Sequence, residues 1–142
     1  MPSLSAIELE PELRRYTQLR VTNEAEMRAY VEKALAEQAR GEALPFAIRD
    51  LASGEIAGST RFAAIELGHR RAEIGWTWLG KRWRRTAFNT EAKLLLLTHA
   101  FETMKLNRVE FKTDVLNEAS RRALARIGAR EEGIFRRHMV MG

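Results

Sequence analysis

Four cations lie close together between Leu79 and Phe88, and side chains of this kind can bind an anion. They are Lys81, Arg82, Arg84 and Arg85. Apolar residues at helical spacing follow directly, from about residue 90 to residue 104. The first turn of a helix presents unpaired N–H groups and the positive end of the helix dipole, which favours anions. This stretch predicts a phosphate or pyrophosphate site, and the alternative is a solvated basic turn, because no Walker or Rossmann glycine pattern is present.

A strand and a helix are expected on either side of this basic turn. Ile74, Trp76 and Trp78 alternate with Gly75 and Thr77, which is typical of a strand with one buried face. Asn89 or Thr90 is placed to cap the helix that follows.

The rest of the chain predicts an α+β domain that spans residues 1–142. A helix over 23–40 begins at Asn23 and stops at Gly41, and strands over 44–49, 55–65 and 71–78 form an antiparallel meander. After the helix over 90–104, a strand over 108–115 completes a crossover between parallel strands. A helix from Asn117 to Gly128 and a strand over 130–141 follow, and the helices cover a mixed sheet.

Composition limits the partners and the compartment. The net charge of +5 and the pI near 10.1 favour anionic partners such as a phosphorylated cofactor, an acidic substrate or nucleic acid. Nucleic acid is the weakest of these, because the charge is modest and no ladder of exposed aromatic residues is evident. The chain has no cysteine, and the spacing of its histidines suggests no metal site. No apolar run is long enough to span a bilayer and no signal-peptide core is present, so we expect a cytoplasmic protein without a membrane partner.

Several segments in this order resemble the GNAT superfamily of acetyl-CoA-dependent N-acetyltransferases, most of all the branch that acetylates the N-termini of ribosomal proteins. They are AEIGWTWL, the basic turn, NTEAKLLLLTHAFE, RVEFKTD and NEASRRALARIGAREEG, and the resemblance covers roughly residues 44–140. It implies a splayed central sheet, with acetyl-CoA in the gap between the strand at 71–78 and the strand at 108–115. It also implies that the backbone of Ile74, Gly75 and Trp76 pairs with the pantetheine arm, whereas packing in the core is the alternative for Trp76 and Trp78.

The resemblance places the cofactor's pyrophosphate on the loop before the long helix. The family's loop reads Gln/Arg-x-x-Gly-x-Gly/Ala, and here Ala87 and Asn89 replace the two small residues. Glycine normally allows close backbone approach, so Arg84 and Arg85 are expected to offset lost N–H contacts through their charge. The cofactor-binding residues implied in this loop are Arg84, Arg85, Thr86, Ala87, Phe88, Asn89 and Thr90.

The resemblance also implies catalytic residues. Glu73 occupies the strand position at which several family members carry a base, and the alternative is a surface glutamate paired with Arg70 or Arg71. In many members a tyrosine seven residues after the capping asparagine is the general acid, and here that position is Leu124. The ribosomal branch instead carries a serine three residues after this asparagine. That serine is Ser120, which either hydrogen-bonds the cofactor sulfur or bonds locally in the first helical turn. Asn117 is a helix cap that can also contact the cofactor.

The resemblance implies a further strand and helix before Met1 and a further strand after Gly142. Such a shortened sheet exposes an edge, which predicts a homodimer that pairs through the strand at 130–141. The expected function is transfer of an acetyl group from acetyl-CoA to a primary amine, either a protein N-terminus or a small molecule. The alternative is a catalytically weak acyl-CoA-binding module.

Overall fold

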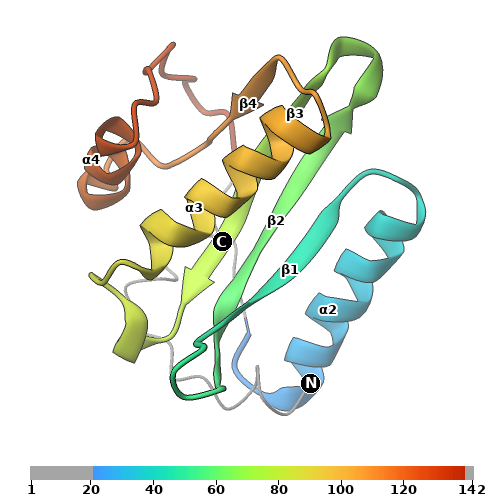
Figure 1. The fold of residues 1–142 in the computed structure, drawn as a ribbon, viewed down its shortest axis with the longest axis vertical. Helices are drawn as coiled ribbons and strands as arrows, with labels where there is room; N and C mark the ends of the chain where they lie inside the picture. Colours follow the sequence, from blue (N-terminus) through green and yellow to red (C-terminus); the bar gives the residue numbers. More distant parts are fainter. Residues whose placement is uncertain (1–20, 140–142) are drawn as a thin grey trace.

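The computed structural model describes residues 21–139, and four strands form one sheet in that part of the chain (Figure 1). β1 (Leu44–Arg49), β2 (Ile56–Glu66) and β3 (Arg71–Leu79) form an antiparallel meander. β4 (Arg108–Glu110) pairs parallel to β3 at the edge of the sheet. The predicted α+β fold with a meander and one parallel crossover is confirmed. None of the helices within residues 21–139 is long and apolar enough to cross a membrane.

The helix α2 (Glu24–Ala39) lies on one face of the sheet, and its predicted ends are confirmed. The Asn23 side chain accepts a hydrogen bond of 2.9 Å from the Glu26 N–H, which satisfies one of the free donors of the first turn. Gly41 follows the helix with a φ of +74°, a conformation that glycine adopts without strain. Met27 and Ala34 face the sheet and are buried.

The long helix predicted over 90–104 is divided in the structure. α3 (Phe88–Thr98) is regular, and one wider π-helical turn, η4 (His99–Thr103), follows it. The N-cap position of α3 is Ala87, which offers no side-chain hydrogen bond. The prediction that Asn89 or Thr90 caps this helix was wrong, because the helix begins before both residues and they lie within its first turn. The Thr86 hydroxyl lies 3.4 Å from the Phe88 nitrogen instead.

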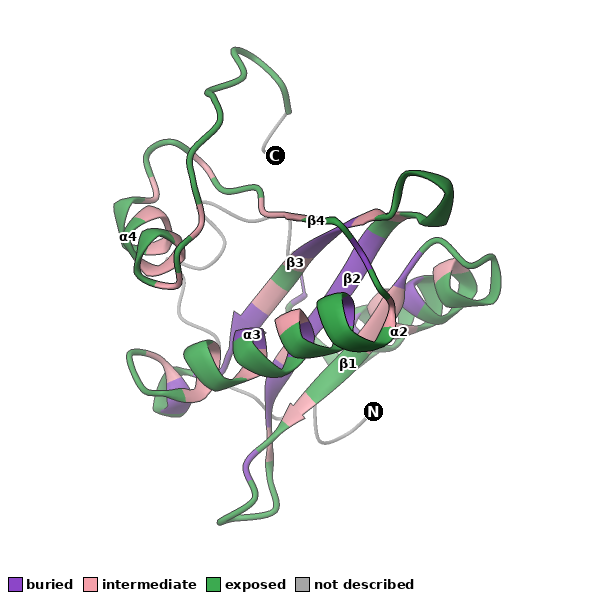
Figure 2. Ribbon diagram, turned by 45° about the horizontal axis from the view of Figure 1, so that its top comes forward, coloured by how far each residue is buried: buried purple, intermediate pink, exposed green. Residues whose placement is uncertain are grey.

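Buried residues gather in the central strands β2 and β3 (Figure 2), and side chains pack in clusters on both faces of the sheet. Six buried residues form the layer under α3: Phe62, Ala72, Ile74, Leu96, Ala100 and Leu106. On the opposite face, Trp78 of β3 packs with Met27 of α2 and with Val21. Ile74 and Trp78 therefore face opposite sides of the sheet, although an uninterrupted strand would place them on the same side.

A β-bulge in β3 explains this change of face. Ser59 of β2 is opposite Trp78 and Arg61 is opposite Gly75, so one residue of β2 faces two residues of β3, Trp76 and Thr77. Trp76 has a φ of +50°, which is rare for a bulky side chain. The prediction that Ile74, Trp76 and Trp78 share one buried face was wrong, because the extra residue shifts the alternation.

The chain after β4 leaves the sheet sooner than predicted. β4 ends at Glu110 rather than at residue 115, and α4 (Glu118–Arg126) then begins at Asn117, whose side chain accepts a hydrogen bond of 3.2 Å from the Ser120 N–H. The predicted strand over 130–141 was also wrong, since residues 131–139 contain no strand and residues 140–142 lie outside the described part. Two ion pairs, Arg108–Glu132 and Arg121–Glu131, hold this segment against β4 and α4 in place of a strand ladder.

Candidate cofactor-binding and active site

A gap opens at the edge of β3 where β4 ends. The two strands pair only over Arg71–Glu73 and Arg108–Glu110, whereas β3 continues to Leu79. Within the described residues, β3 therefore has no neighbouring strand on this edge from Ile74 onward. Unpaired backbone N–H and C=O groups along such an edge can pair with amide groups of an extended ligand. The predicted splay between the two strands is thus present, and it begins directly after Glu73.

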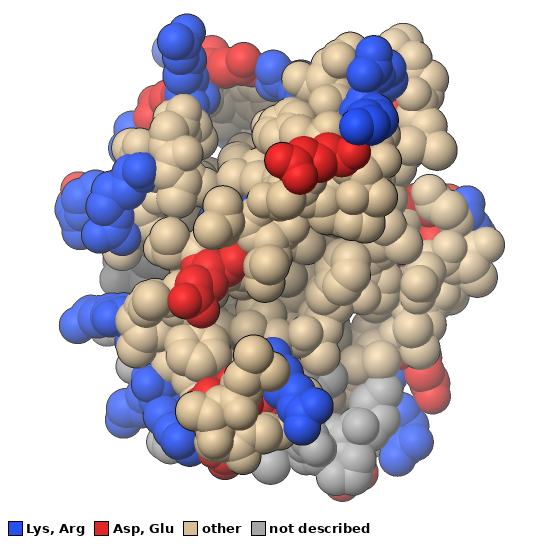
Figure 3. Space-filling model, in the orientation of Figure 1, with Lys and Arg blue, Asp and Glu red and all other residues tan. Residues whose placement is uncertain are grey.

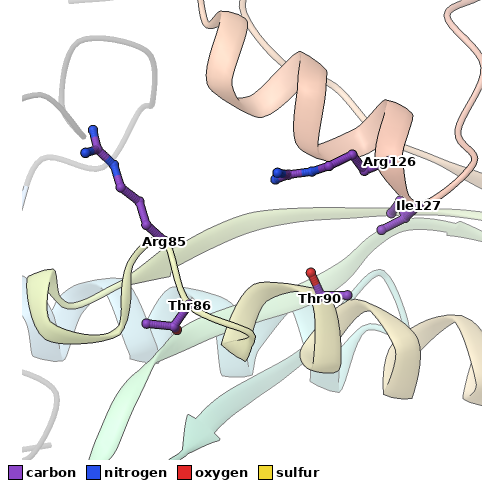
Figure 4. Close-up of a pocket in the computed structure, with 5 residues that line it drawn as sticks. All are labelled: Arg85, Thr86, Thr90, Arg126 and Ile127. Atoms are coloured by element: carbon purple, nitrogen blue, oxygen red, sulfur yellow. The ribbon is translucent and has the colours of Figure 1, made fainter.

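An open hollow of about 500 Å³ lies where the start of α3 meets the end of α4 (Figure 4). Its lining comes from the basic turn, α3 and α4: Arg85, Thr86, Thr90, Arg126 and Ile127. Neither Arg85 nor Arg126 forms an ion pair with any carboxylate of residues 21–139. Lysine and arginine also gather on the side of the molecule that α4 and the basic turn form (Figure 3). Two unpaired guanidinium groups beside an uncapped helix start form a site suited to phosphate groups.

The basic turn is held in place by a buried hydrogen bond. The indole N–H of Trp83 donates to a carboxylate oxygen of Asp50 over 3.0 Å, and this bond is the main cause that lowers the pKa of Asp50. Trp83 also packs with Ala57 and Leu79, and Phe88 lies against this cluster. Phe88 therefore anchors the loop by packing. These contacts fix the turn that carries the cations to the loop after β1. The conformation of the turn therefore does not depend on its own short sequence alone.

The other predicted loop residues are distributed around the hollow. Arg84 is half-buried at the end of the short helix η3 (Lys81–Trp83) and is not among the lining residues. Ala87 has an ordinary right-handed conformation, so this position does not require glycine. The Asn89 side chain accepts a hydrogen bond from Lys93. Arg85, Thr86 and Thr90 are the predicted residues that the structure brings together at the hollow.

Glu73 is a buried carboxylate at the point where the two strands part. Its side chain is 8% exposed and lies 3.5 Å from the Lys112 ammonium, whereas Arg70 and Arg71, the partners predicted for it, bond elsewhere. Burial raises the pKa of Glu73, and the nearby Lys112 opposes this rise only in part. Gly75 leaves room for the carboxylate, because a Cβ there would lie 3.3 Å from a Glu73 oxygen. Of the predicted catalytic residues, Glu73 thus has a pKa shifted towards that of a neutral-pH base.

The remaining predicted residues differ in their burial and in the element that carries them. Ile74 is buried in the core under α3, so only its backbone is available to a ligand. Trp76 is 42% exposed, and the Arg61 guanidinium lies 5.2 Å from the centre of its ring. Asn117 caps α4, and Ser120 is half-buried in the first turn of that helix. No hydrogen bond in the described part of the chain links Ser120 to Glu73 or to the hollow.

Three residues at this site were not predicted from the sequence. Arg126 and Ile127 line the hollow, but Arg126 is one of several arginines near α4 and nothing in its spacing distinguishes it. Lys93, in the helix after the basic turn, is only 8% exposed, which is unusual for a lysine. Its position on the same helical face as Leu96 and Ala100 was a signal that could have marked it.

The comparison with known families agrees with this geometry. The profile described as "Acetyltransferase (GNAT) domain" matches residues 1–130. The chain belongs to the GNAT acetyltransferase family. The predicted family is therefore confirmed.

Related proteins support this assignment. The N-acetyltransferase YoaA of Bacillus subtilis, named as uncharacterized, is 33% identical over 106 residues, which are 75% of this chain and 58% of that protein. A GCN5-related N-acetyltransferase from Brucella melitensis is 36% identical with a TM-score of 0.76, over 82% of this chain and 52% of that chain. RimJ from Mycobacterium smegmatis, solved with CoA-disulfide, is 26% identical with a TM-score of 0.80, over 92% of this chain and 64% of that one. This chain thus spans 58% of the length of the Bacillus relative.

Proposed function

We propose that this chain transfers the acetyl group of acetyl-CoA to a primary amine. The observation that carries the proposal is the gap at the edge of β3, which leads from Glu73 towards the basic turn and the start of α3. The gap offers backbone partners to an extended ligand arm, and the hollow offers unpaired cations to phosphate groups. Family membership and the complex of the related RimJ with a CoA derivative support the same ligand.

The residues of this chain fit coenzyme A in two regions. Arg85, Arg126 and the first N–H groups of α3 would hold phosphate oxygens, with the Thr86 and Thr90 hydroxyls beside them. The backbone of Ile74, Gly75 and Trp76 would hold the amides of the pantetheine arm along the open edge of β3. When bound, acetyl-CoA supplies a thioester whose acyl carbon an unprotonated amine can attack.

Glu73 would remove the proton that an ammonium carries before the attack. Its raised pKa makes it a stronger base than an exposed glutamate, while the nearby Lys112 favours its ionised form. Ser120 would hydrogen-bond the departing sulfur from the first turn of α4, and Asn117 would fix that turn by capping it. A protein N-terminus is one candidate acceptor, as in the ribosomal branch, and a small-molecule amine is the other.

The cofactor assignment is tested through the hollow. Arg85→Ala combined with Arg126→Ala removes both unpaired cations, and a charge-assisted hydrogen bond contributes about 1.5–3 kcal/mol. We expect acetyl-CoA to bind the double variant at least about tenfold more weakly, with a reduced dependence on salt. Isothermal titration with acetyl-CoA at several salt concentrations measures both effects.

A matched control is Arg28→Ala combined with Arg40→Ala, because both of these arginines lie at α2 in exposed ion pairs. The control removes the same charge and should bind acetyl-CoA as the wild type does. Equal weakening in both double variants would remove the hollow from the site. Thiol release with a panel of amines then separates an acetyltransferase from an acyl-CoA-binding module, since a module binds acetyl-CoA without releasing thiol.

A further inference from the structure

Lys93 is a buried amine on the face of α3 that packs against the sheet. The residue is only 8% exposed, and Leu96 and Ala100 follow it on the same face. The ammonium nitrogen donates a hydrogen bond of 2.8 Å to the Asn89 amide oxygen, one turn earlier. It also lies 5.9 Å from the centre of the Phe111 ring, just beyond the end of β4.

This position is unfavourable for a positive charge in the free protein. No carboxylate of residues 21–139 lies within ion-pair distance of Lys93. Burial removes the ammonium from water and lowers the pKa of Lys93. The hydrogen bond to Asn89 also brings the nitrogen back to the first turn of α3, where the helix dipole is positive and opposes a cation. One amide oxygen and one distant ring compensate only part of this cost.

The two contacts of the Lys93 nitrogen involve residues that adjoin the hollow and the gap in the sequence. Asn89, its hydrogen-bond partner, belongs to the first turn of α3, and the next residue, Thr90, lines the hollow. Phe111 follows β4, the strand whose end opens the gap. A phosphate group held at the start of α3 would therefore supply the anion that the protein itself does not place beside Lys93.

We propose that Lys93 is the buried counter-charge for the cofactor's phosphate groups and that it takes up a proton when the cofactor binds. The proposal rests on the function proposed above, because it takes acetyl-CoA as the ligand. Lys93 is thus a binding residue whose charge is balanced by the phosphate groups of the ligand. Acetyl-CoA affinity therefore falls as the pH rises. The fall occurs between the lowered pKa of the free protein and the higher pKa of the complex.

Other charged groups near α3 do not give the same signal. Glu73 is paired with Lys112, and Glu110 is paired with Arg108. On α3 itself, Glu91 is exposed, and His99 lies more than one turn beyond Lys93, in η4. On the elements around Lys93, the charged and titratable groups include Glu73, Arg85, Glu91, His99, Glu110, Lys112 and Arg126.

The experiment measures protons directly. Acetyl-CoA is titrated into the protein at several pH values from about 7 to about 10, each in two buffers with different heats of ionisation, and the difference gives the number of protons taken up. The phosphate monoester of the cofactor has its second pKa near 6 and the pyrophosphate has no second ionisation, so both are fully ionised in this range and release no proton. The wild type should take up protons on binding in the part of this range where Lys93 is neutral in the free protein, and its affinity should fall as the pH rises there.

Two variants identify the group. Lys93→Met keeps the length and loses the charge, so it should bind acetyl-CoA about tenfold more weakly, take up no proton and raise the Tm of the free protein. Lys93→Arg keeps the charge and should retain affinity but lose the proton uptake, because arginine does not titrate. Lys33→Met, on the exposed side of α2, is the control and should behave as the wild type.

The outcomes are distinct. Binding by the wild type without proton uptake overturns this inference and leaves the proposed function standing. Proton uptake that persists in Lys93→Met also overturns it, because another group would then titrate. A wild type that does not bind acetyl-CoA at all overturns both the inference and the proposed function. If Lys93→Met does not fold, the wild-type proton count and Lys93→Arg still decide.

Discussion

Glu73 combines a buried position with a nearby cation at the point where β3 and β4 part. Burial raises the pKa of its carboxyl, and Lys112 and Glu110 act on it with opposite signs. Since the pKa is raised, ionisation of Glu73 is less favourable in the folded protein than in the unfolded chain. Such a carboxyl is suited to accept a proton from an ammonium group near neutral pH.

Glu73→Gln removes the proposed base while it keeps the shape of the side chain. We expect turnover to fall about 10²–10⁴-fold at neutral pH, the usual contribution of a general base. The loss should be smaller at high pH, where the acceptor amine loses its proton unaided. Initial rates of thiol release across the pH range measure this difference, and a loss that is the same at every pH would contradict the role.

The same variant has a stability signature that does not depend on catalysis. A group with a raised folded-state pKa stabilises the fold below its unfolded pKa, and this contribution is lost as the pH rises through the folded pKa. The Tm of the wild type should therefore fall relative to that of Glu73→Gln as the pH rises from about 4 into this range. Matching Tm profiles would show that the carboxyl does not have the raised pKa.

Residue roles that depend on local sequence could be predicted, and those that depend on tertiary contacts could not. Asn23 and Asn117 cap their helices as predicted, because a cap involves only the next three residues. The ion pair of Glu73 with Lys112 joins β3 to the chain beyond β4, so it depends on the strand register. Arg126 reaches the hollow only because α4 folds back over the start of α3.

Among the elements, β3 carries the feature that shapes the site most. The bulge at Trp76 and Thr77 places Trp78 on the α2 face while Ile74 stays under α3. It also increases the local twist of the strand at the gap, as bulges do. The three long strands could be predicted from apolar alternation and turn residues, but a bulge leaves the composition unchanged, and no glycine marks the positive φ at Trp76.

Gly58 of β2 tests how tightly the strands pack just beyond the bulge. A Cβ on Gly58 would lie 2.0 Å from the backbone oxygen of Trp78, a contact that backbone atoms cannot relieve cheaply. Gly58→Ala should therefore lower the free energy of unfolding by at least about 2 kcal/mol, as measured by urea denaturation.

Gly68 is the matched control for this substitution. It lies in the turn before β3, and a Cβ there would meet nothing within 4 Å. Gly68→Ala should leave the stability unchanged or raise it slightly, since alanine restricts the unfolded chain. If the two alanine variants had equal stability, β2 and β3 would not approach each other as described.

At the scale of the whole molecule, the C-terminal segment departs most from the sequence prediction. A final strand was predicted over 130–141, but Ile134 and Phe135 are 57% and 71% exposed and no strand lies beside them in the described part. The homodimer predicted through that strand loses its structural basis, although assembly in solution stays a prediction. The local sequence could not show whether these residues form a strand, because a strand also needs a neighbouring strand to pair with.

The ion pairs of Glu131 and Glu132 should control access to this segment. Both are exposed pairs with contacts of 2.9 Å, Arg121 Nη2 with Glu131 Oε2 and Arg108 Nη1 with Glu132 Oε1, so each contributes little to overall stability. Glu131→Gln combined with Glu132→Gln should change the free energy of unfolding by less than about 1 kcal/mol but speed tryptic cleavage after Arg130 severalfold. High salt should speed cleavage of the wild type in the same way.

The control replaces two exposed glutamates that pair within their own helices, Glu24→Gln with Glu118→Gln. This variant removes the same charge but keeps both ion pairs of the C-terminal segment, so its cleavage rate should match that of the wild type. A wild-type rate in the Glu131 and Glu132 variant would show that other contacts hold the segment.

The arrangement of β3 and the basic turn also has an optical consequence. All three tryptophans of the chain, Trp76, Trp78 and Trp83, lie within these two neighbouring elements. Trp76 is 42% exposed, whereas Trp78 and Trp83 are buried and only 3% and 8% exposed, so their emission maxima should differ. The tryptophan fluorescence of the protein therefore arises beside the gap and the turn, and unlabelled protein carries its own reporter of events there.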